Sequence, residues 1–340
     1  MLLSLFIMPK IKIAFICGFI LLTCLLYAQD EDSRPVKEII AEALANPDTV
    51  TVLDLSDKLV DALPEDFAKL KNLKTLFLNR DNLTEIPPVI FKLKNLEALS
   101  ITGWPYYDDD TNHHTLVRIS PQIASLTKLH ELNLESNSIH DLPQEFAKLR
   151  LLKLLYFNEN SLNDSDMKVI CKLDSLTSLD ISANDLTRLP ISFSNLKYLK
   201  YLLINNRWAE GCPVGSTMGF PKVICSLANL EILTMQGQAI DSLPVAIGNL
   251  KKLKVLDLYA NSFLSMPESI GNLKELTDFN IDLLCLGSMS KLCDLHFYFP
   301  ESICNLQKLK KFSFNSRSIA PKEYERIQKC LPKGLIPNKE

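Results

Sequence analysis

The stretch LHELNL at residues 129–134 recurs as LKTLFL at 73–78 and as LKVLDL at 253–258. All three copies carry leucine at the first, fourth and sixth positions, and apolar and polar residues alternate over the second half. Alternation with a period of two is typical of a short strand that buries one face. The copies therefore predict one recurring strand.

Each stretch opens a longer unit, which in its plain form repeats every 23 residues, as from Leu73 to Leu96. The unit reads L-x-x-L-x-L-x-x-N-x-L-x-x-L-P-x-x-I-x-x-L-x-x, so its spacing changes from that of a strand to that of a helix. Prolines at the change favour a short helical or 3-10 turn: Pro64, Pro87, Pro143, Pro190, Pro244 and Pro267. Eleven units, the last incomplete, begin at Val50, Leu73, Leu96, Leu129, Leu152, Leu176, Leu199, Leu230, Leu253, Leu276 and Leu309.

A single strand and turn cannot enclose their own apolar side, so the units must stack with their strands side by side. The predicted fold class is α/β: a curved solenoid with a parallel sheet on its concave side, short turns on its convex side and a helical cap at each end. Asn137, Asn160, Asn184 and Asn261 occupy the ninth position, where an amide side chain bonds to backbone groups at the strand end. We expect these asparagines to be structural.

With this pattern, the chain resembles a bacterial exported leucine-rich-repeat protein of the 23-residue Leu-Pro type over essentially its whole mature sequence. Residues 38–56 resemble the helix and first strand that open many such proteins, and residues 321–332 resemble their closing helix. The resemblance implies an N-terminal cap at 29–49, repeats at 50–319 and a C-terminal cap at 320–340.

The first residues predict an export signal, because Lys10 and Lys12 precede an apolar run from Ile13 to Tyr27. We expect cleavage after Ala28, which makes 1–28 the signal peptide and places the protein in the periplasm, on the cell surface or outside the cell. Two alternatives are a lipid anchor through Cys24 and an uncleaved membrane anchor. No later apolar run is long enough to span a membrane.

Charge and motifs exclude several classes of function. The formal net charge of −3 gives no concentrated basic face for nucleic acid. The sequence lacks a Gly-x-Ser-x-Gly elbow, a glycine-rich phosphate loop and a His-Glu-x-x-His motif, so we expect no enzyme and no cofactor. The carboxylates and histidines at 108–114 match no metal-binding spacing, so we expect no metal.

Three units are longer than the plain repeat, with insertions near 104–118, 208–219 and 285–298. Each insertion follows the strand, so the three loops should leave from one edge of the solenoid. They hold aromatic residues suited to recognition, because such side chains give large contact area with few rotamers to freeze: Trp104, Tyr106, Tyr107 and Trp208. The alternative is that these aromatics cover exposed core.

Outward positions of the strands predict an acidic, aromatic-dotted concave face, while lysines such as Lys69, Lys92, Lys148, Lys197 and Lys251 fall on the opposite side. The binding candidates are Phe77, Glu131, Glu135, Tyr156, Asp180, Tyr201, Asp257, Tyr259 and Asp282. Asp54 and Asp278 are also acidic there, and Lys311 is basic. A basic or polar protein surface suits such a face best. The alternatives are an ordinary solvated face and a glycan-binding surface protein in which Trp104, Tyr106 and Tyr107 stack on sugars.

Removal of the signal leaves seven cysteines, an odd number that cannot all pair within one chain. Cys171, Cys225 and Cys304 share one position in their units and are too far apart to bridge one another, so we expect small core residues. Cys285 and Cys293, within one loop, are the candidate disulfide.

Overall fold

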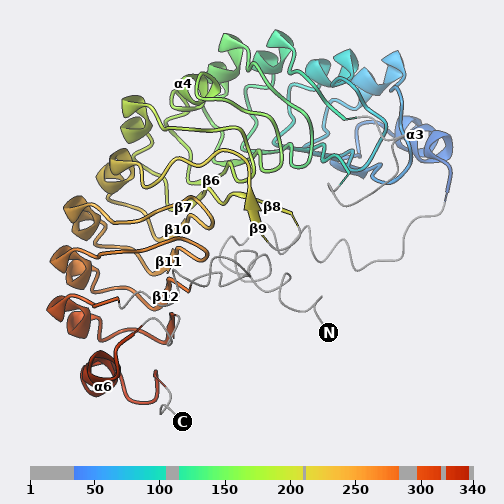
Figure 1. Ribbon diagram of the computed structural model, residues 1–340. Helices are drawn as coiled ribbons and strands as arrows, with labels where there is room; N and C mark the ends of the chain where they lie inside the picture. Colours follow the sequence, from blue (N-terminus) through green and yellow to red (C-terminus); the bar gives the residue numbers. More distant parts are fainter. Residues whose placement is uncertain (1–33, 105–114, 210–211, 283–296, 315–318, 337–340) are drawn as a thin grey trace. The chain divides into compact units, whose positions relative to one another are not determined.

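The computed structural model describes residues 34–104, 115–209, 212–282, 297–314 and 319–336 (Figure 1). A boundary between two compact units falls between Glu42 and Ala43. Helix α3 (Val36–Ala45) lies within the range predicted for the N-terminal cap. The predicted signal peptide, 1–28, lies outside the described residues. The sheet, the turns and the remaining helices belong to the unit 43–340.

Eleven strands of three residues form one parallel sheet, one strand for each predicted repeat (Figure 1). Sheet order follows chain order, and a separate antiparallel hairpin of β8 (Arg207–Ala209) and β9 (Cys212–Val214) lies between β7 and β10 in the chain without joining the sheet. The predicted solenoid repeat is confirmed. The strands are β1 (Val52–Asp54), β2 (Thr75–Phe77), β3 (Ala98–Ser100), β4 (Glu131–Asn133), β5 (Leu154–Tyr156), β6 (Ser178–Asp180), β7 (Tyr201–Leu203), β10 (Ile232–Thr234), β11 (Val255–Asp257), β12 (Asp278–Asn280) and β13 (Lys311–Ser313).

The other side of the stack is built from five-residue 3-10 turns, as the prolines predicted. Pro64, Pro143 and Pro244, for example, each cap such a turn. The unit that begins at Leu152 has no proline there and forms the short helix α4 (Asp166–Ile170) instead. The turns are η1 (Glu65–Lys69), η2 (Pro88–Lys92), η3 (Pro121–Ser125), η4 (Gln144–Lys148), η5 (Ile191–Asn195), η6 (Lys222–Ser226), η7 (Val245–Asn249), η8 (Glu268–Asn272) and η10 (Glu301–Asn305).

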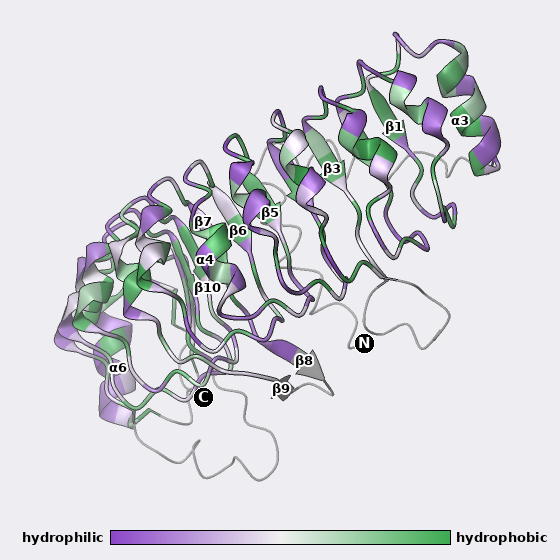
Figure 2. Ribbon diagram, turned by 90° about the horizontal axis from the view of Figure 1, so that it is seen from above, coloured by the Kyte–Doolittle hydropathy of each residue, from purple (hydrophilic) through white to green (hydrophobic). Residues whose placement is uncertain are grey.

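The core is one continuous apolar layer between the sheet and the turns. The middle residue of a strand points inward, as Leu76 and Leu132 do, and turns contribute large side chains such as Phe67 and Phe146; all four are fully buried. Figure 2 shows hydrophobic residues recurring in each unit beside hydrophilic ones. Because each buried side chain of this size contributes roughly 2 kcal/mol, every unit depends on its neighbours.

An asparagine ladder joins consecutive units at the end of the strands. Asn160 accepts the N–H of Ile139 at 2.9 Å and donates to the carbonyls of Leu134 (2.8 Å) and Phe157 (3.1 Å). Asn137, Asn184 and Asn261 make the equivalent bonds. The structural role expected of these asparagines is confirmed.

The residue before the ladder position turns the chain through a left-handed conformation in the plain units. Its φ lies between 53° and 65° at Asp57, Arg80, Ser136, Glu159, Ala183, Gly237 and Ala260. Gly103 and Asn206, the equivalent residues of two lengthened units, do not adopt this conformation. Gly103 instead approaches the next unit so closely that a Cβ would lie 1.7 Å from the carbonyl oxygen of Ser136. The two insertions therefore begin where this turn is lost.

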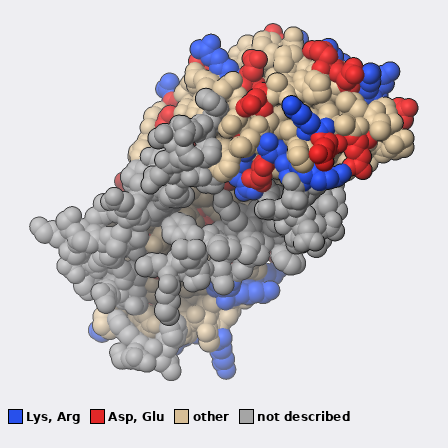
Figure 3. Space-filling model, turned by 90° about the vertical axis from the view of Figure 1, so that its right-hand side faces the viewer, with Lys and Arg blue, Asp and Glu red and all other residues tan. Residues whose placement is uncertain are grey.

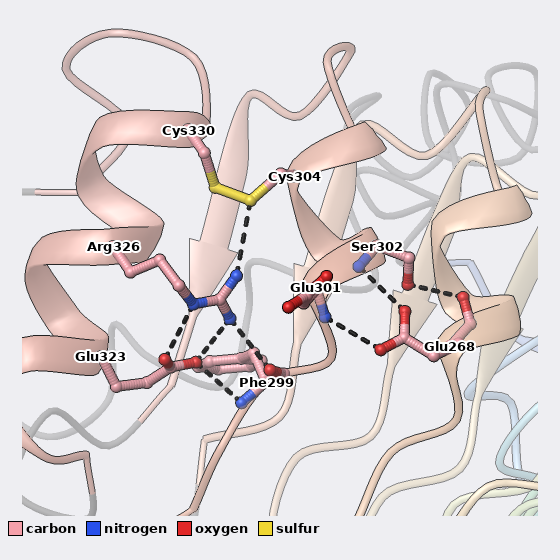
Figure 4. Close-up of polar contacts among 8 residues, drawn as sticks. All are labelled: Glu268, Phe299, Glu301, Ser302, Cys304, Glu323, Arg326 and Cys330. Atoms are coloured by element: carbon pink, nitrogen blue, oxygen red, sulfur yellow. Dashed lines mark hydrogen bonds and ion pairs between the residues drawn. A yellow bond between two sulfur atoms is a disulfide. The ribbon is translucent and has the colours of Figure 1, made fainter.

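A disulfide between Cys304 and Cys330 fastens the last helix, α6 (Pro321–Cys330), to turn η10 (Figure 4). The expectation that Cys304 is a free core residue was wrong. In the described part of the chain, helix α6 rather than another 3-10 turn follows strand β13, and it brings Cys330 to a Cα–Cα distance of 5.1 Å from Cys304. Cys171 and Cys225 are free and buried as expected, and burial raises the pKa of both thiols to about 11. Cys285 and Cys293 lie outside the described residues.

Charged groups reinforce this end of the stack (Figure 4). Arg326 donates to Glu323 and to the carbonyl of Phe299, while Glu323 accepts the N–H of Phe299 at 3.0 Å. In turn η8, Glu268 accepts hydrogen bonds from the N–H groups of Glu301 and Ser302 at the start of η10, both at 3.0 Å. Hydrogen bonds from Arg326 and from Ser302, respectively, hold the pKa values of Glu323 and Glu268 below the ordinary range.

Candidate binding face

The first and third residues of the eleven strands point away from the core, and we call the surface that they form the sheet face. Its side chains range from buried to exposed, unlike the strand midpoints, which face the core. Among the described strands the sheet face carries five acids, Asp54, Glu131, Asp180, Asp257 and Asp278, and one base, Lys311. Glu135 and Asp282 add two acids just past β4 and β12. Negative charge on this face exceeds positive charge.

One group of candidate residues lies on the neighbouring strands β4, β5 and β6. Tyr156 stands in register with Asp180 on one side and with Asn133 on the other. Glu131 begins β4, opposite Leu154. All are half-buried, and burial raises the pKa of Glu131. This group combines an aromatic ring with two carboxylates within three adjacent strands.

A second group gathers around Asp257 at the end of β11. Asp257 accepts hydrogen bonds from Gln236 Nε2 (2.7 Å), Asn280 Nδ2 (3.0 Å) and the N–H of Tyr259 (3.1 Å). Burial raises its pKa despite these bonds. The pKa of Tyr259 is also raised, first by burial and then by the charges of Asp282 and Asp257. Asp257, Tyr259 and Asp282 therefore form one electrostatic group.

The structure does not bring all the candidate residues into one patch. Strands β6 and β11 are separated by β7 and β10, which corresponds to roughly 14 Å at about 4.8 Å per strand. Tyr201, at the start of β7, lies between the two groups, while Phe77 on β2 lies three strands before Tyr156. A partner that contacts every candidate must be extended along the stack.

A strip of exposed lysines borders the sheet face where the strands begin, and sequence analysis missed it. The residue before the strand is Lys74, Lys153, Lys200, Lys254 or Lys310 in five units. Glu231 pairs with Lys254 (2.6 Å) and Lys200 (3.8 Å), and Glu97 pairs with Lys74 (3.1 Å). In the sequence, these five lysines stand one position before their strands, outside the alternating positions from which the sheet face was predicted. On the side of the molecule seen in Figure 3, acidic and basic side chains lie close together over the described surface.

The lysines assigned to the opposite side lie at or just after the turns. Lys69, Lys92 and Lys148 end η1, η2 and η4, and Lys197 and Lys251 follow η5 and η7; all five are exposed. These five lysines therefore add no positive charge to the sheet face.

The insertions are described in part. Trp104 occupies the ladder position of its unit and is half-buried, while Tyr106 and Tyr107 lie outside the described residues. The second insertion forms the hairpin of β8 (Arg207–Ala209) and β9 (Cys212–Val214), in which Trp208 pairs with Pro213 through the backbone.

Arg207, a residue that sequence analysis overlooked, anchors this hairpin. Its guanidinium donates to the carbonyls of Asn160 (3.3 Å) and Ala183 (3.2 Å), and so bridges two earlier units. Asn206 beside it donates to the carbonyl of Gly237 at 2.9 Å. The base of the hairpin is thus tied to repeats on both sides, which fixes where Trp208 leaves the solenoid. The only indication in the sequence was that arginine stands at the ninth position of this unit, where the repeat pattern has asparagine.

Two family models match the repeated part of the chain. Residues 127–186 match "Leucine rich repeat", and residues 209–333 match "Leucine-rich repeat region". The fold is a leucine-rich-repeat solenoid. None of the helices in the described part of the chain is long and apolar enough to cross a membrane.

Sequence relatives share a short part of this solenoid. The chain is 34% identical over 124 residues to the probable serine/threonine-protein kinase pats1 of Dictyostelium discoideum, which is 36% of this chain and 4% of that protein. It is 33% identical over 123 residues to the plant intracellular Ras-group-related LRR protein 8 of rice, which is 36% of this chain and 31% of that protein. The chain therefore spans well under two thirds of these relatives.

Solved structures agree with the fold over more of the chain. The complex of PEPR1 with AtPEP1 matches with a TM-score of 0.58 and 24% identity, over 80% of this chain and 36% of that one. The Arabidopsis receptor kinase HAESA, solved with the peptide hormone IDA and the co-receptor SERK1, matches with a TM-score of 0.56 and 20% identity, over 81% and 47%. At these identities the likeness shows the fold alone.

Proposed function

We propose that this leucine-rich-repeat solenoid is a non-enzymatic protein-binding module whose sheet face takes an extended, basic segment of its partner. The supporting observation is the charge balance of the sheet face, on which burial raises the pKa values of Glu131 and Asp257. A carboxyl pKa that burial raises means that the ionised form is poorly solvated. An arginine or lysine from a partner would supply a compensating positive charge.

The spacing of the two groups supports an extended partner. About 14 Å separates β6 from β11, a distance that four or five residues of extended chain span at ~3.3 Å each. Tyr156 and Tyr259 give each group an aromatic contact beside its carboxylates. One structure with the same fold, that of the Arabidopsis receptor kinase HAESA, contains a peptide hormone, IDA, beside the co-receptor SERK1.

We further propose that the protein is exported, as residues 1–28 predict. The disulfide between Cys304 and Cys330 supports export, because such bonds persist in oxidising compartments. Trp104 and Trp208 at the insertions are proposed as secondary contacts at the edge of the sheet face.

The test uses synthetic peptides of equal length and equal aromatic content whose net charge runs from strongly negative to strongly positive. Affinity for the full mature protein is measured by fluorescence anisotropy at low and at physiological salt. We expect affinity to rise with positive charge and to weaken with salt. A variant carrying Glu131→Gln, Asp180→Asn and Asp257→Asn should lose at least about tenfold in affinity for the most basic peptide.

A matched variant neutralises three acids on the turn side by Glu65→Gln, Asp66→Asn and Glu145→Gln, and so changes the net charge equally. These residues lie in η1 and η4, away from the sheet face. Retained affinity in this variant, beside loss in the first, supports the proposal. Affinity that ignores peptide charge, or equal loss in both variants, contradicts it.

A further inference from the structure

One position of the asparagine ladder, here called a rung, is occupied by an aspartate instead of an asparagine. Asp81 occupies the ninth position of the unit that begins at Leu73 and is 4% exposed. Its Oδ1 accepts the N–H groups of Val60 (3.1 Å) and Lys58 (3.2 Å) from the preceding unit. This half of the side chain therefore does what the amide oxygen of asparagine does in the other rungs.

The second side-chain oxygen of Asp81 differs from the amide nitrogen that asparagine has in the other rungs. In the regular rung Asn137, the amide nitrogen donates to the carbonyls of Ile101 (2.9 Å), Leu134 (3.1 Å) and Glu135 (3.2 Å). In Asp81 the corresponding atom is Oδ2, which is buried and has no hydrogen-bond partner. By the symmetry of the repeat, the carbonyls of Leu55 and Leu78 occupy the places of Ile101 and Leu134. An ionised oxygen cannot donate to them.

The charged residues beside Asp81 in the described part of the chain include Asp57, Arg80 and Lys58. Asp57, from the loop after β1, raises the pKa of Asp81 further through its negative charge. Arg80, from the loop that carries Asp81, donates two hydrogen bonds to Asp57. Lys58 contributes its backbone N–H, and the facing loop after β3 presents Thr102 and Gly103, which carry no charge.

We propose that Asp81 is a proton-dependent fastener between the first two repeats. As a neutral carboxylic acid, it donates its Oδ2–H to a backbone carbonyl and completes the rung. As a carboxylate, it leaves that bond unmade and sets a negative oxygen against carbonyl oxygens, which loosens the loops after β1 and β2. Acid tightens this end of the solenoid, and neutral pH loosens it.

The direction of the pH dependence follows from linkage. Burial raises the pKa of Asp81 from 3.8 to about 6, so the folded state holds the proton more tightly than the unfolded state. The folded state therefore binds more protons across this window, and stability falls as pH rises from about 4 through about 6. Above this pH window, the contribution of Asp81 to stability stays constant at its lower value.

The test is amide hydrogen exchange of the full mature protein, read at the Val60 N–H and expressed as protection factors so that the intrinsic pH dependence is removed. We expect protection at Val60 to rise by at least about tenfold between about pH 7.5 and about pH 4.5. In Asp81→Asn, protection should be high at both pH values. The Ile139 N–H, which bonds to Asn160, should show no such change in either protein.

The reciprocal variant Asn160→Asp should transfer the pH dependence to Ile139. If it fails to fold, Asn184→Asp, whose side chain is less buried, serves in its place with the Leu162 N–H as reporter. Protection at Val60 that is independent of pH in the natural protein overturns the proposal. A pH dependence that persists unchanged in Asp81→Asn also overturns it.

Discussion

The turn side and the sheet face of the same repeats follow different rules. On the turn side, almost every unit has a five-residue 3-10 turn, most often capped by proline, with its apolar side chains facing the core. On the sheet face, every strand has three residues, yet the outward residues vary from valine to tyrosine to aspartate. The regular side stabilises the stack, and the variable side is free to carry specificity.

The largest expected effect comes from the turn side. Phe146 in η4 is fully buried, with its ring centroid 5.7 Å from that of Phe157, so Phe146→Ala leaves a cavity between two units. We expect a loss of about 3–5 kcal/mol in the free energy of unfolding, measured by chemical denaturation. Lys148→Ala, an exposed change on the same turn, should shift it by under about 0.5 kcal/mol. Equal effects would show that the turn side is not the stabilising side.

Removal of the disulfide should have the next largest effect. The double variant Cys304→Ser and Cys330→Ser frees α6 from η10 and should lower the free energy of unfolding by about 2–4 kcal/mol. Thermal unfolding with and without reductant checks this. Reductant should destabilise the natural protein more than it destabilises the double variant; an equal loss in both proteins would contradict the assignment.

Neutralising a carboxylate of the sheet face should not lower the free energy of unfolding, in contrast to the two changes above. Because burial raises the pKa of Glu131, its ionised form costs stability, and that cost grows as pH rises above the ordinary glutamate value. Glu131→Gln should therefore leave stability unchanged or raise it at neutral pH, with the gain vanishing in acid. Affinity for basic peptides should fall in the same variant.

The matched control for Glu131→Gln is Glu65→Gln, an exposed change on η1 that should affect neither stability nor affinity appreciably. Denaturation at neutral and at acid pH, beside peptide titrations, separates the two outcomes. A large loss of stability in Glu131→Gln would make this residue part of the scaffold.

The smallest expected effect concerns the free thiols of the turn side. Cys171 and Cys225 are buried, and burial raises the pKa of each to about 11, so their reactive thiolate is scarce at neutral pH. Mass spectrometry after iodoacetamide treatment should find both unlabelled in the folded protein and labelled in denaturant. Rapid labelling of the folded protein would show that these units open readily.

Most of the fold was predictable because its signals are local and repeated. Leucine spacing predicted the eleven strands of the parallel sheet, and the prolines predicted most of the turns, because each unit contacts chiefly its neighbours. The disulfide of Cys304 was not predictable, because it depends on where α6 docks after the last unit. The consequence of Asp81 also needed the structure, since aspartate and asparagine look alike in the pattern until the partners of both side-chain atoms are known.

The candidate site was predictable in composition and only partly in arrangement. Period-two alternation identified outward residues such as Tyr156 and Asp257, but not the division into two groups, which follows from how many strands lie between them. It also missed Gln236 and Asn280, whose amides hold Asp257 in place. The sequence gives no direct sign of such contacts between units.

The most direct test of the central claim is carboxyl footprinting, in which carbodiimide labelling is compared with and without the most basic peptide of the series. Labelling of Asp180, Asp257 and Asp282 should fall when the peptide binds, while labelling of Glu65 and Glu145 on the turn side should stay the same. Protection confined to the turn-side acids, with the sheet face still labelled, would show that the peptide does not bind to the sheet face.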